Sequence, residues 1–346
     1  MPHDHPSSDQ ARNALVRIAY GPMAAQTLGA AVRLRVVDRI GDGERGAREL
    51  AAECAADAQA MGRLLRALAG LGLLAERAPG VFAVTPAGAL LGEDHPESLH
   101  SFIRMFTDPA MLRAWERLDD SVRTGTPSFD AVFGTDFFGH LAQHPQLSAD
   151  FNAAMSQGTR DTAALVPAAY DFGRRTVVAD IGGGDGTLLA AILRAHPELR
   201  GILFDSAEGL AQAPARLAQE RVEDRCSLVT GDFFATAPEG ADLYLLKSVI
   251  HDWDDERCAR ILRHCRRVIP DHGRLLIVEP VLPPLVDPAA DSLAYLTDLN
   301  MLVNVGGRER TREDFERLCR SAGFAVTTVT RLPRSNRFSL IEAEPV

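Results

Sequence analysis

One stretch constrains the fold more than any other: residues 177–187, which read VVADIGGGDGT. Its apolar first half is typical of a strand that is buried on both faces, as in a parallel sheet. The glycines at 182, 184 and 186 permit a sharp turn and let a ligand lie against the backbone. An apolar-rich helix is expected from Thr187 onward. This strand, turn and helix predict a ligand at the carboxyl end of the first strand of an open α/β sheet.

The spacing of the glycines bears on which ligand binds. A dinucleotide fingerprint has the pattern G-x-G-x-x-G, whereas these glycines follow G-x-G-x-G and Thr187 occupies the third position of that pattern. The acidic residue Asp180 lies two places before the first glycine. This D-x-G-x-G-x-G form resembles the first motif of class I S-adenosylmethionine methyltransferases. Taken alone, the stretch is also compatible with a tight turn that binds no ligand.

Four further strands are expected, and polar residues follow most of them. Residues 201–205 end in Asp205, where nucleoside sites place an acid that accepts from both ribose hydroxyls. Residues 226–234 end in Gly-Asp-Phe-Phe, so Asp232 can accept from an adenine amino group and Phe233 can cover the ring. Residues 242–248 lead into His251, and residues 273–280 form the last of these strands. Strands that alternate with helical segments predict a doubly wound sheet.

Six short motifs follow one another: D-x-G-x-G-x-G from 180, F-D at 204–205, G-D-F-F at 231–234, L-K-x-x-x-H-D-W at 246–253, E-P at 279–280 and G-G-R-E-R-T at 306–311. In this order they resemble the plant-type, caffeic-acid-like small-molecule O-methyltransferases, in their bacterial branch that tailors aromatic natural products. The resemblance covers most of the chain. It implies an α/β fold: a C-terminal doubly wound, Rossmann-like class I methyltransferase sheet after an N-terminal, mainly helical winged-helix dimerisation domain. It also implies S-adenosylmethionine as methyl donor, S-adenosylhomocysteine as product, and a homodimer.

The resemblance assigns roles to individual positions. Around the cofactor it places Asp180, Gly182, Gly184, Asp205, Ser206, Asp232, Phe233, Lys247, Trp253 and Thr159. Around an aromatic acceptor it places Met155, Asp252, Asn304, Met301 and Tyr295. Two positions depart from the family pattern. Ser206 replaces a usual hydrophobic residue, and Gly158 stands where plant members have a histidine, which argues against plant phenylpropanoids as acceptors.

The catalytic prediction centres on His251. A phenol, with a pKa of about 10, attacks a methyl group well only as its oxyanion, and a histidine with a pKa of about 6.5 can take that proton at neutral pH. Glu279, at the end of the fifth strand, and Glu309, in the last motif, match the residues that flank this base in the resembled family. Simpler interpretations exist: a surface histidine, an acidic first helical turn at 252–255, and a Trp253 that only packs the loop.

Four regions are expected: a disordered tail at 1–10, a winged-helix-like dimerisation domain at 11–95, a helical connector lining the acceptor site at 96–170, and the cofactor-binding catalytic domain at 171–346. The second region shows helices at 46–55 and 57–74, the latter capped by Asp57, and a two-stranded wing around Pro79 and Gly80. Glycine and proline breaks predict a loop at 124–138.

A winged helix also fits a ligand-responsive transcriptional regulator. Residues 41–95 carry five arginines against eight acidic residues, a poor balance for holding phosphates. The net charge of the whole chain is −10, which likewise argues against a nucleic-acid partner. Dimerisation is therefore the preferred role of this region.

Composition narrows the remaining classes. No apolar run reaches the roughly 18 residues of a membrane helix, and the first residues show no signal-peptide core. Five scattered cysteines without a C-x-x-C pair predict reduced thiols in a cytoplasmic protein. No His, Cys or acidic residues show metal-ligand spacing, so no metal is expected. A relative repurposed for decarboxylation or hydroxylation of a polyketide stays an alternative.

Overall fold

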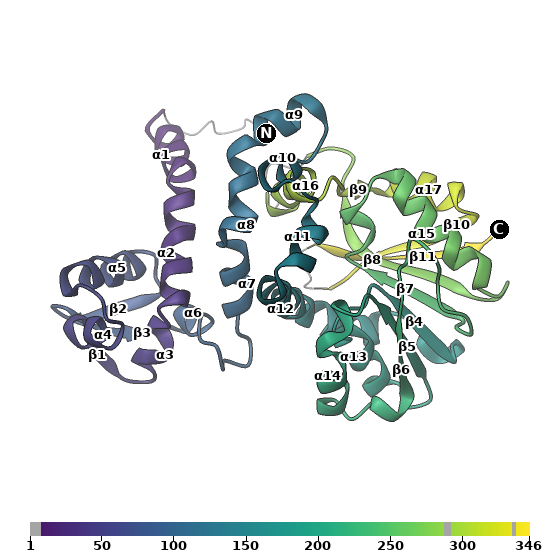
Figure 1. Ribbon diagram of the computed structural model, residues 1–346, viewed down its shortest axis with the longest axis horizontal. Helices are drawn as coiled ribbons and strands as arrows, with labels where there is room; N and C mark the ends of the chain where they lie inside the picture. Colours follow the sequence, from purple (N-terminus) through teal and green to yellow (C-terminus); the bar gives the residue numbers. More distant parts are fainter. Residues whose placement is uncertain (1–7, 287–291, 334–336) are drawn as a thin grey trace, which may run out of the picture. The chain divides into compact units, whose positions relative to one another are not determined.

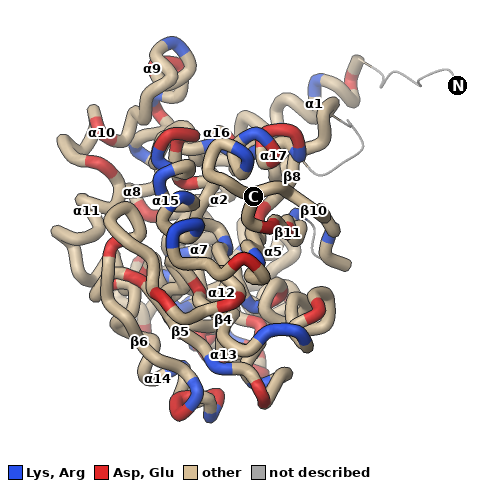
Figure 2. Tube along the Cα trace, turned by 90° about the vertical axis from the view of Figure 1, so that its right-hand side faces the viewer, with Lys and Arg blue, Asp and Glu red and all other residues tan. Residues whose placement is uncertain are grey.

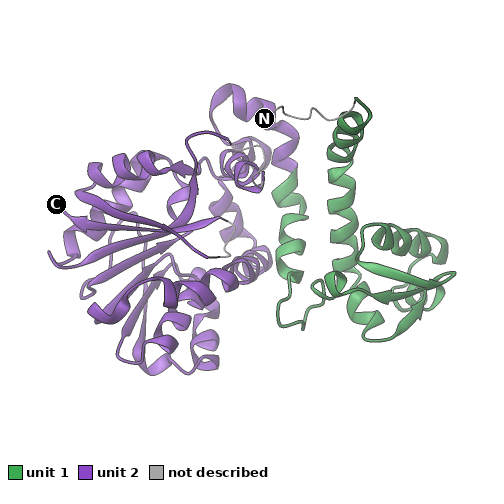
Figure 3. Ribbon diagram, turned by 180° about the vertical axis from the view of Figure 1, so that it is seen from behind, with its two compact units in different colours: residues 1–112 green, residues 113–346 purple. Residues whose placement is uncertain are grey.

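The computed structural model describes residues 8–286, 292–333 and 337–346. It divides into two compact units, residues 1–112 and 113–346, which Figure 3 shows in different colours. The division falls after 112, whereas the sequence placed domain boundaries at 95/96 and 170/171. No helix among the described residues is long and apolar enough to cross a membrane.

The first unit is mainly helical. Its helices are α1 (Ser8–Ala19), α2 (Gly21–Arg33), α3 (Val36–Ile40), α4 (Ala47–Glu53), α5 (Ala58–Gly70), α6 (Pro86–Ala89), α7 (His100–Phe106) and α8 (Pro109–Leu112). A three-stranded antiparallel sheet has the order β1-β3-β2, from β1 (Glu44–Gly46), β2 (Leu74–Ala78) and β3 (Val81–Val84). The predicted wing and the Asp57 cap, which accepts from the Ala60 N–H at 2.8 Å, are both present. Strand β1 was not predicted.

The expected disordered tail is wrong for residues 8–10, which form the first turn of α1; residues 1–7 lie outside the described residues. Helix α1 has no buried residue. Several of its apolar side chains are largely exposed, including Leu15 at 69% and Ile18 at 74%. The core of this unit lies elsewhere, where fully buried Leu50, Leu65 and Phe82 pack together.

The second unit begins with short helices: η1 (Arg113–Arg117), α9 (Leu118–Thr124), α10 (Ser128–Phe133), α11 (Phe137–Gln143) and the long α12 (Pro145–Ala169). The predicted loop at 124–138 is therefore wrong. Its glycine and proline residues end and begin short helices: Pro127 precedes α10, Gly134 ends α10 in the left-handed region, and Asp136 caps α11 through the Gly139 N–H. The glycine and proline residues suggest a loop because the helices between them, α10 and α11, have only six and seven residues.

The centre of this unit is an eight-stranded sheet with the order β10-β11-β8-β7-β4-β5-β6, and β9 pairs with β8 (Figure 1). The strands are β4 (Val177–Ile181), β5 (Arg200–Asp205), β6 (Cys226–Thr230), β7 (Leu243–Lys247), β8 (Arg274–Leu282), β9 (Arg310–Thr311), β10 (Phe324–Arg331) and β11 (Phe338–Pro345). Strands β4 to β8 are parallel to one another. β11 pairs antiparallel with β8, and β10 pairs antiparallel with β11. Because β5 lies on one side of β4 and β7 on the other, the strand order reverses at β4, where open sheets bind ligands.

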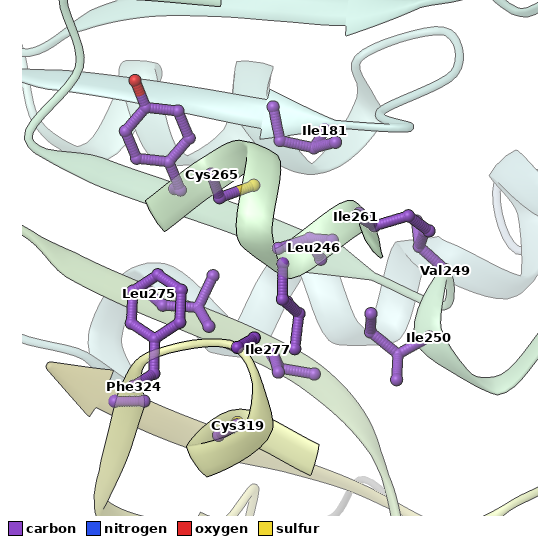
Figure 4. Close-up of a cluster of buried hydrophobic side chains, with 14 of the residues drawn as sticks. Ile181, Leu246, Val249, Ile250, Ile261, Cys265, Leu275, Ile277, Cys319 and Phe324 are labelled. Carbon is purple, nitrogen blue, oxygen red and sulfur yellow. The ribbon is translucent and has the colours of Figure 1, made fainter. Parts of the chain in front are cut away.

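Helices cover both faces of the sheet, as Figure 1 shows. Along β7, Tyr244 and Leu246 point into the core beneath α15 (Asp255–Val268) and α17 (Arg312–Ser321), part of which is drawn in Figure 4. Leu243 and Leu245 point into the opposite core, beneath α12, α13 (Thr187–Ala195) and α14 (Ala213–Gln219). Alternate residues are thus buried on opposite faces, which explains the continuous apolar runs of these strands. The expected doubly wound sheet is confirmed.

Candidate active site

The turn after β4 holds the backbone in conformations that suit glycine. Gly182 and Gly184 have φ values of 70° and 58°, a region that residues with a side chain rarely adopt. A side chain at Gly182 would also meet Val249 at 2.8 Å, and Phe233 lies 3.6 Å from the same point. The predicted cofactor residues Gly182 and Phe233 are therefore neighbours, although their strands are separated in the sequence.

Two carboxylates lie next to this turn. Asp205, at the end of β5, accepts hydrogen bonds from the N–H groups of Gly184 (2.9 Å) and Ser206 (2.7 Å). Burial raises the pKa of Asp205. Burial, and then the charge of Asp205, raise the pKa of Asp180 to about 7. A ligand that brings positive charge to this edge would offset both effects, because a nearby opposite charge favours the ionised carboxylate.

Asp232 lies in the turn after β6, where its carboxylate accepts from the Phe234 N–H at 2.8 Å. This contact is local, and it leaves Asp232 exposed at the surface of the turn. Asp232 and Phe233 follow β6 as expected, so they share the sheet edge with Asp205.

Lys247, the last residue of β7, reaches the long helix α12. Its Nζ donates to Thr159 Oγ1 at 2.9 Å, and Thr159 in turn donates to the Met155 carbonyl at 2.7 Å. Burial lowers the pKa of Lys247 to about 8, although the charges of Glu279, Asp180 and Asp252 act in the opposite direction. The structure thus brings together three residues that the sequence placed in the cofactor and acceptor sites.

His251 lies in η5 (Ile250–Asp252), the tight turn that follows β7. Ser248, just before it, is one of the described non-glycine residues with positive φ, at 54°. Glu279 Oε1 accepts from the N–H groups of Val249 and Ile250, both at 2.9 Å, and of His251 at 3.3 Å. This buried carboxylate therefore holds the backbone of the turn in place.

Three carboxylates surround the imidazole. His251 Nδ1 lies 3.2 Å from Glu309 Oε1 and 3.4 Å from Glu279 Oε2, and Nε2 lies 3.5 Å from Asp252 Oδ1. Because an ionised carboxylate only accepts, Nδ1 donates to Glu309 and Nε2 is the nitrogen left to take a proton. Burial alone would lower the pKa of His251, but the charges of Glu279, Asp252 and Glu309 outweigh it and raise the pKa to about 10. The expected value near 6.5 therefore needs correction.

The neighbouring acidic residues divide between two roles. Asp254 is the N-cap of α15 and accepts from the Arg257 N–H at 2.8 Å, while Asp255 lies in the first turn, so the interpretation as an acidic helix start is correct for these two residues. Asp252 instead faces His251, and burial raises the pKa of Asp252 to about 6.

Trp253 packs against protein aromatic rings. Its indole stacks on Phe138 with 5.2 Å between ring centroids and meets Phe234 edge-on at 4.8 Å. Arg257 lies over the ring at 5.5 Å. The indole Nε1 is buried without a hydrogen-bond partner. Packing of the loop is thus observed, and stacking on adenine stays a prediction.

Three predicted acceptor residues lie on α16 (Leu293–Asn304). Met301 and Asn304 are buried, at 8% and 1% exposure, and the hydroxyl of Tyr295 is buried without a partner. The turn after α16 presses against η5, because a side chain at Gly307 would lie 2.0 Å from the His251 carbonyl oxygen. The segment that follows α16 is therefore in contact with the turn that carries His251.

Arg310 belongs to the last of the six motifs, but the sequence did not predict it as a site residue. It is only 1% exposed, yet it donates to the carbonyls of Ile250 (2.7 Å) and Trp253 (2.9 Å) and pairs with Asp255 at 2.7 Å. The guanidinium therefore holds both ends of the turn that carries His251. Its position directly after Glu309 was the only signal in the sequence.

Several buried polar atoms of the predicted site residues have no hydrogen-bond partner. Among the described residues they include Trp253 Nε1, Glu279 Oε2, Glu309 Oε2, Tyr295 Oη and Asn304 Oδ1. Buried polar groups are normally paired, so such a group of atoms marks a place where a ligand supplies the partners.

His251, Glu279 and Glu309 offer nitrogen and oxygen atoms within 4.8 Å of one another, a separation that a metal ion could also use. The family resemblance placed Glu279 and Glu309 beside His251, but their wide separation along the chain shows no metal-ligand spacing, and no metal was expected. Glu279 Oε1 is already engaged by three backbone N–H groups, and Glu279 Oε2 and Glu309 Oε1 both face His251 Nδ1, a nitrogen that carries a proton. The donor set therefore fits an imidazole base better than a metal centre.

The comparison with protein families bears directly on this geometry. The model of the O-methyltransferase domain matches residues 115–325, and that of the O-methyltransferase dimerisation domain matches residues 16–94. The chain belongs to this O-methyltransferase family. The winged-helix region of this chain thus matches a dimerisation domain, which favours dimerisation over the role of a transcriptional regulator.

Known relatives agree. O-demethylpuromycin-O-methyltransferase from Streptomyces alboniger is 47% identical over all of this chain and 92% of its own length. The solved structure of LaPhzM superposes with a TM-score of 0.92 at 41% identity, over 97% of this chain and 99% of that one. An O-methyltransferase from neocarzinostatin biosynthesis, solved with S-adenosylmethionine and 2-hydroxy-5-methyl naphthoic acid, gives 0.79 at 33% identity over 94% and 96%. The protein is an S-adenosylmethionine-dependent methyltransferase.

Proposed function

We propose that this methyltransferase methylates a hydroxyl of an aromatic small molecule, a bacterial secondary metabolite, with His251 as general base. The observation that carries the proposal is the imidazole held among Glu309, Glu279 and Asp252 at the end of β7. One relative is named as a 3-amino-4-hydroxybenzoate 4-O-methyltransferase, and another was solved with 2-hydroxy-5-methyl naphthoic acid. The hydroxyl-bearing acceptor is carried over from them.

The protein's own groups have clear tasks in this reaction. Nε2 of His251 takes the hydroxyl proton, and Glu309 and Glu279 stabilise the imidazolium that forms. When bound, S-adenosylmethionine supplies a methyl group that the acceptor oxygen takes by in-line displacement, leaving S-adenosylhomocysteine. Glu279 and Arg310 keep the turn of His251 in register with the acceptor.

The cofactor residues follow the sheet edge. Asp205 would accept from the ribose hydroxyls, and Asp232 and Phe233 would bind adenine beside the turn of Gly182 and Gly184. Asp180, Ser206, Lys247 with Thr159, and Trp253 would complete the cofactor site. The raised pKa values of Asp180 and Asp205 support this assignment, because a sulfonium cation suits buried carboxylates.

The acceptor would lie against Met155, Asp252, Tyr295, Met301 and Asn304. Met155 lies one helical turn before Thr159, which donates to the Met155 carbonyl and accepts from Lys247. Asn304 precedes the turn that touches His251.

The protein would act as a homodimer built by its first unit. Residues 16–94 match a dimerisation domain, and α1 leaves Leu15, Ile18 and the nearby Met23 at 62–74% exposure. Burying such a row of apolar side chains is favourable, whereas its exposure on a monomer is unusual. Nucleic acid is not expected as a partner, since Figure 2 shows acidic and basic residues interspersed along the trace and the net charge is −10.

The test is a reaction with S-adenosylmethionine labelled on its methyl group and a panel of aromatic phenols, followed by mass spectrometry. The label should appear on an aromatic oxygen. His251→Ala should lower kcat by about two to four decades with un-ionised phenols and far less with a nitrophenol that is ionised at neutral pH. His272→Ala, at an exposed loop position, is the matched control. Equal rates for His251→Ala and wild type with an un-ionised phenol would refute the base assignment.

A further inference from the structure

The carboxylate of Glu309 is held loosely by its own contacts. Its Oε1 lies 3.2 Å from His251 Nδ1, at the long end of the usual range for such a hydrogen bond. Its Oε2 is buried and, among the described residues, has no hydrogen-bond partner. The place of this carboxylate beside the imidazole is therefore decided by the backbone that carries Glu309.

That backbone crosses an irregular segment between two regular elements. Helix α16 ends at Asn304, and β9 begins at Arg310, where it pairs with β8. The last residue of the segment is Glu309, and a side chain of α16 binds it: Asp298 Oδ1 accepts the Glu309 N–H at 2.7 Å. Asp298 thus ties the segment back to the helix directly before the strand begins.

Helix α16 provides a fixed support for this tie. Asp298 lies within the helix, and Trp115 Nε1 of η1 donates to Asn300 Oδ1 at 3.0 Å, which joins α16 to a second element of the same unit. Burial raises the pKa of Asp298, while the hydrogen bond from the Glu309 N–H acts in the opposite direction. A carboxylate binds a backbone N–H more strongly than a neutral acceptor does.

Resting on the proposed role of His251 as the base, we infer that Asp298 is a positioning residue, which holds the main chain of Glu309 so that its carboxylate stays against His251 Nδ1. Without the hydrogen bond from Glu309 to Asp298, the segment would lose its tie to α16. Because the contact with Nδ1 is already long, a small movement of Glu309 would break it and would weaken the attraction between the two charges.

The charges around the imidazole make this effect measurable. Burial lowers the pKa of His251, but three carboxylates from different elements raise it to about 10: Glu279 on β8, Asp252 in η5, and Glu309 before β9. Lys247 of β7 faces Glu279 and Asp252. The charged groups that face Asp298 are Glu309, Arg308 and Arg310. Asp298 would therefore act on the imidazole through Glu309, and its loss should lower the pKa of His251.

Three substitutions separate the hydrogen bond from the charge. Asp298→Ala removes the acceptor. Asp298→Ser, whose oxygen lies one bond closer to the main chain and does not reach the N–H, covers the case in which the alanine variant does not fold. Asp298→Asn loses the charge but keeps an oxygen that can accept. Asp171→Ala is the matched control, because Asp171 also accepts a backbone N–H in the same unit, that of Gly173 at 3.1 Å.

The experiment follows the titration of His251 by NMR, with isotope-labelled histidine and a chelator in the buffer. The signal of His251 is the one that is missing from His251→Ala. Glu309→Gln should lower the midpoint by about one pH unit or more, and Asp298→Ala and Asp298→Ser should reproduce most of this shift. Combining Asp298→Ala with Glu309→Gln should add no further shift, because both act on one contact. Asp298→Asn and Asp171→Ala should keep the wild-type midpoint, and the pH midpoint of kcat/KM with catechol should follow the same order.

Each outcome decides one claim. A wild-type midpoint in folded Asp298→Ala or Asp298→Ser, a shift in Asp298→Asn as large as that in Asp298→Ala, or a further shift in the double variant would overturn the inference. A shift in Asp171→Ala would show a general structural effect and would also overturn it. The proposed function fails separately, if His251→Ala methylates an un-ionised phenol at the wild-type rate, and the NMR midpoints would still decide the role of Asp298.

Discussion

His251 is held in an environment that a free imidazole does not have. Its three carboxylate neighbours favour the charged ring, and they outweigh the effect of burial, so the pKa lies well above the ordinary value. A higher pKa makes the ring a stronger base and stabilises the imidazolium formed by proton transfer. With His251 in the proposed role of general base, a larger share of the free enzyme would be protonated at neutral pH and unable to accept a proton.

This balance predicts the pH dependence. The kcat/KM for catechol should rise with pH through a midpoint above the roughly 6.5 of free histidine, because the ring must lose its proton before it can act. Glu309→Gln should move the midpoint downward, since one of the charges that raise the pKa is removed. Glu239→Gln, at an exposed position, controls for net charge. The midpoints are measured from initial rates across neutral and alkaline pH. Identical midpoints in wild type, Glu309→Gln and Glu239→Gln would contradict the role of Glu309.

Asp205 offers a test of the cofactor site. Asp205→Asn keeps the shape of the side chain but loses the charge that would accept from the ribose hydroxyls. Hydrogen bonds to charged groups contribute about 1.5–3 kcal/mol, so the Kd for S-adenosylhomocysteine should rise by about one to two decades. Asp224→Asn, on the same domain but exposed, should bind as wild type does. Calorimetry that finds unchanged affinity for Asp205→Asn would remove Asp205 from the site.

The cluster of His251, Glu279 and Glu309 also permits a direct test for metal. In the proposed mechanism the imidazole and its carboxylates carry out the proton transfer without a metal, so treatment with a chelator should leave the methylation rate unchanged and added Mg²⁺ should not raise it. The rate of chelator-treated enzyme, with residual metal measured by mass spectrometry, checks this. A loss that a divalent ion restores would assign the cluster to a metal centre.

At the scale of elements, the turn η5 is held from both sides. Glu279 accepts hydrogen bonds from its backbone N–H groups, and Arg310 donates hydrogen bonds to its carbonyls. A short turn has few contacts of its own, so its position depends on these two side chains from β8 and β9. The position of His251 therefore depends on strands β7, β8 and β9 and not on the turn alone.

Removing this support should destabilise the protein. Arg310→Ala leaves the carbonyls of Ile250 and Trp253 with only the Cys258 thiol, a weak donor, at 3.1 and 3.4 Å. The loss of the two guanidinium hydrogen bonds should cost about 1–3 kcal/mol. Arg308→Ala is the matched control: Arg308 also pairs with Asp255, but both side chains are about half exposed, so its loss should cost under about 1 kcal/mol. Urea unfolding measures the difference.

Arg310→Lys covers the case in which the alanine variant does not fold. Lysine keeps the charge near Asp255 but cannot reach both carbonyls with a planar group. It should fold and show a lower kcat with nearly unchanged cofactor affinity. Equal unfolding midpoints for Arg310→Ala and Arg308→Ala would show that the two carbonyls do not depend on Arg310.

At the scale of the whole molecule, the exposed face of α1 and the match to a dimerisation domain lead to a test of assembly. Light scattering should give a mass twice the 37.4 kDa of the chain. Leu15→Glu combined with Ile18→Glu places charges on the apolar face and should shift the equilibrium toward the monomer. Val122→Glu, at a side chain exposed to 63% in the second unit, should leave the dimer intact. A wild-type monomer at micromolar concentration would contradict the proposal.

The sequence by itself determined the parallel part of the sheet and the edge at which the site lies. Asp180, Asp205, Asp232 and His251 each accompany the end of a strand, and parallel strands bring their carboxyl ends to one edge whatever the loops do. The glycine turn and the helix cap of Asp57 were equally readable, because both depend on neighbours within a few residues.

Only the tertiary structure decided which distant groups meet. Three such contacts join segments many residues apart: the hydrogen bonds of Arg310 to the turn of His251, the stack of Phe138 on Trp253, and the hydrogen bond from Trp115 to Asn300. The family resemblance had placed Glu279 and Glu309 beside His251, but their distances from the imidazole are set by packing. The antiparallel strands β10 and β11, and the short helices α10 and α11, were also missed. The reason is physical: such contacts, and the pKa values they set, depend on how packed elements bring side chains to within a few ångströms, which no local pattern records.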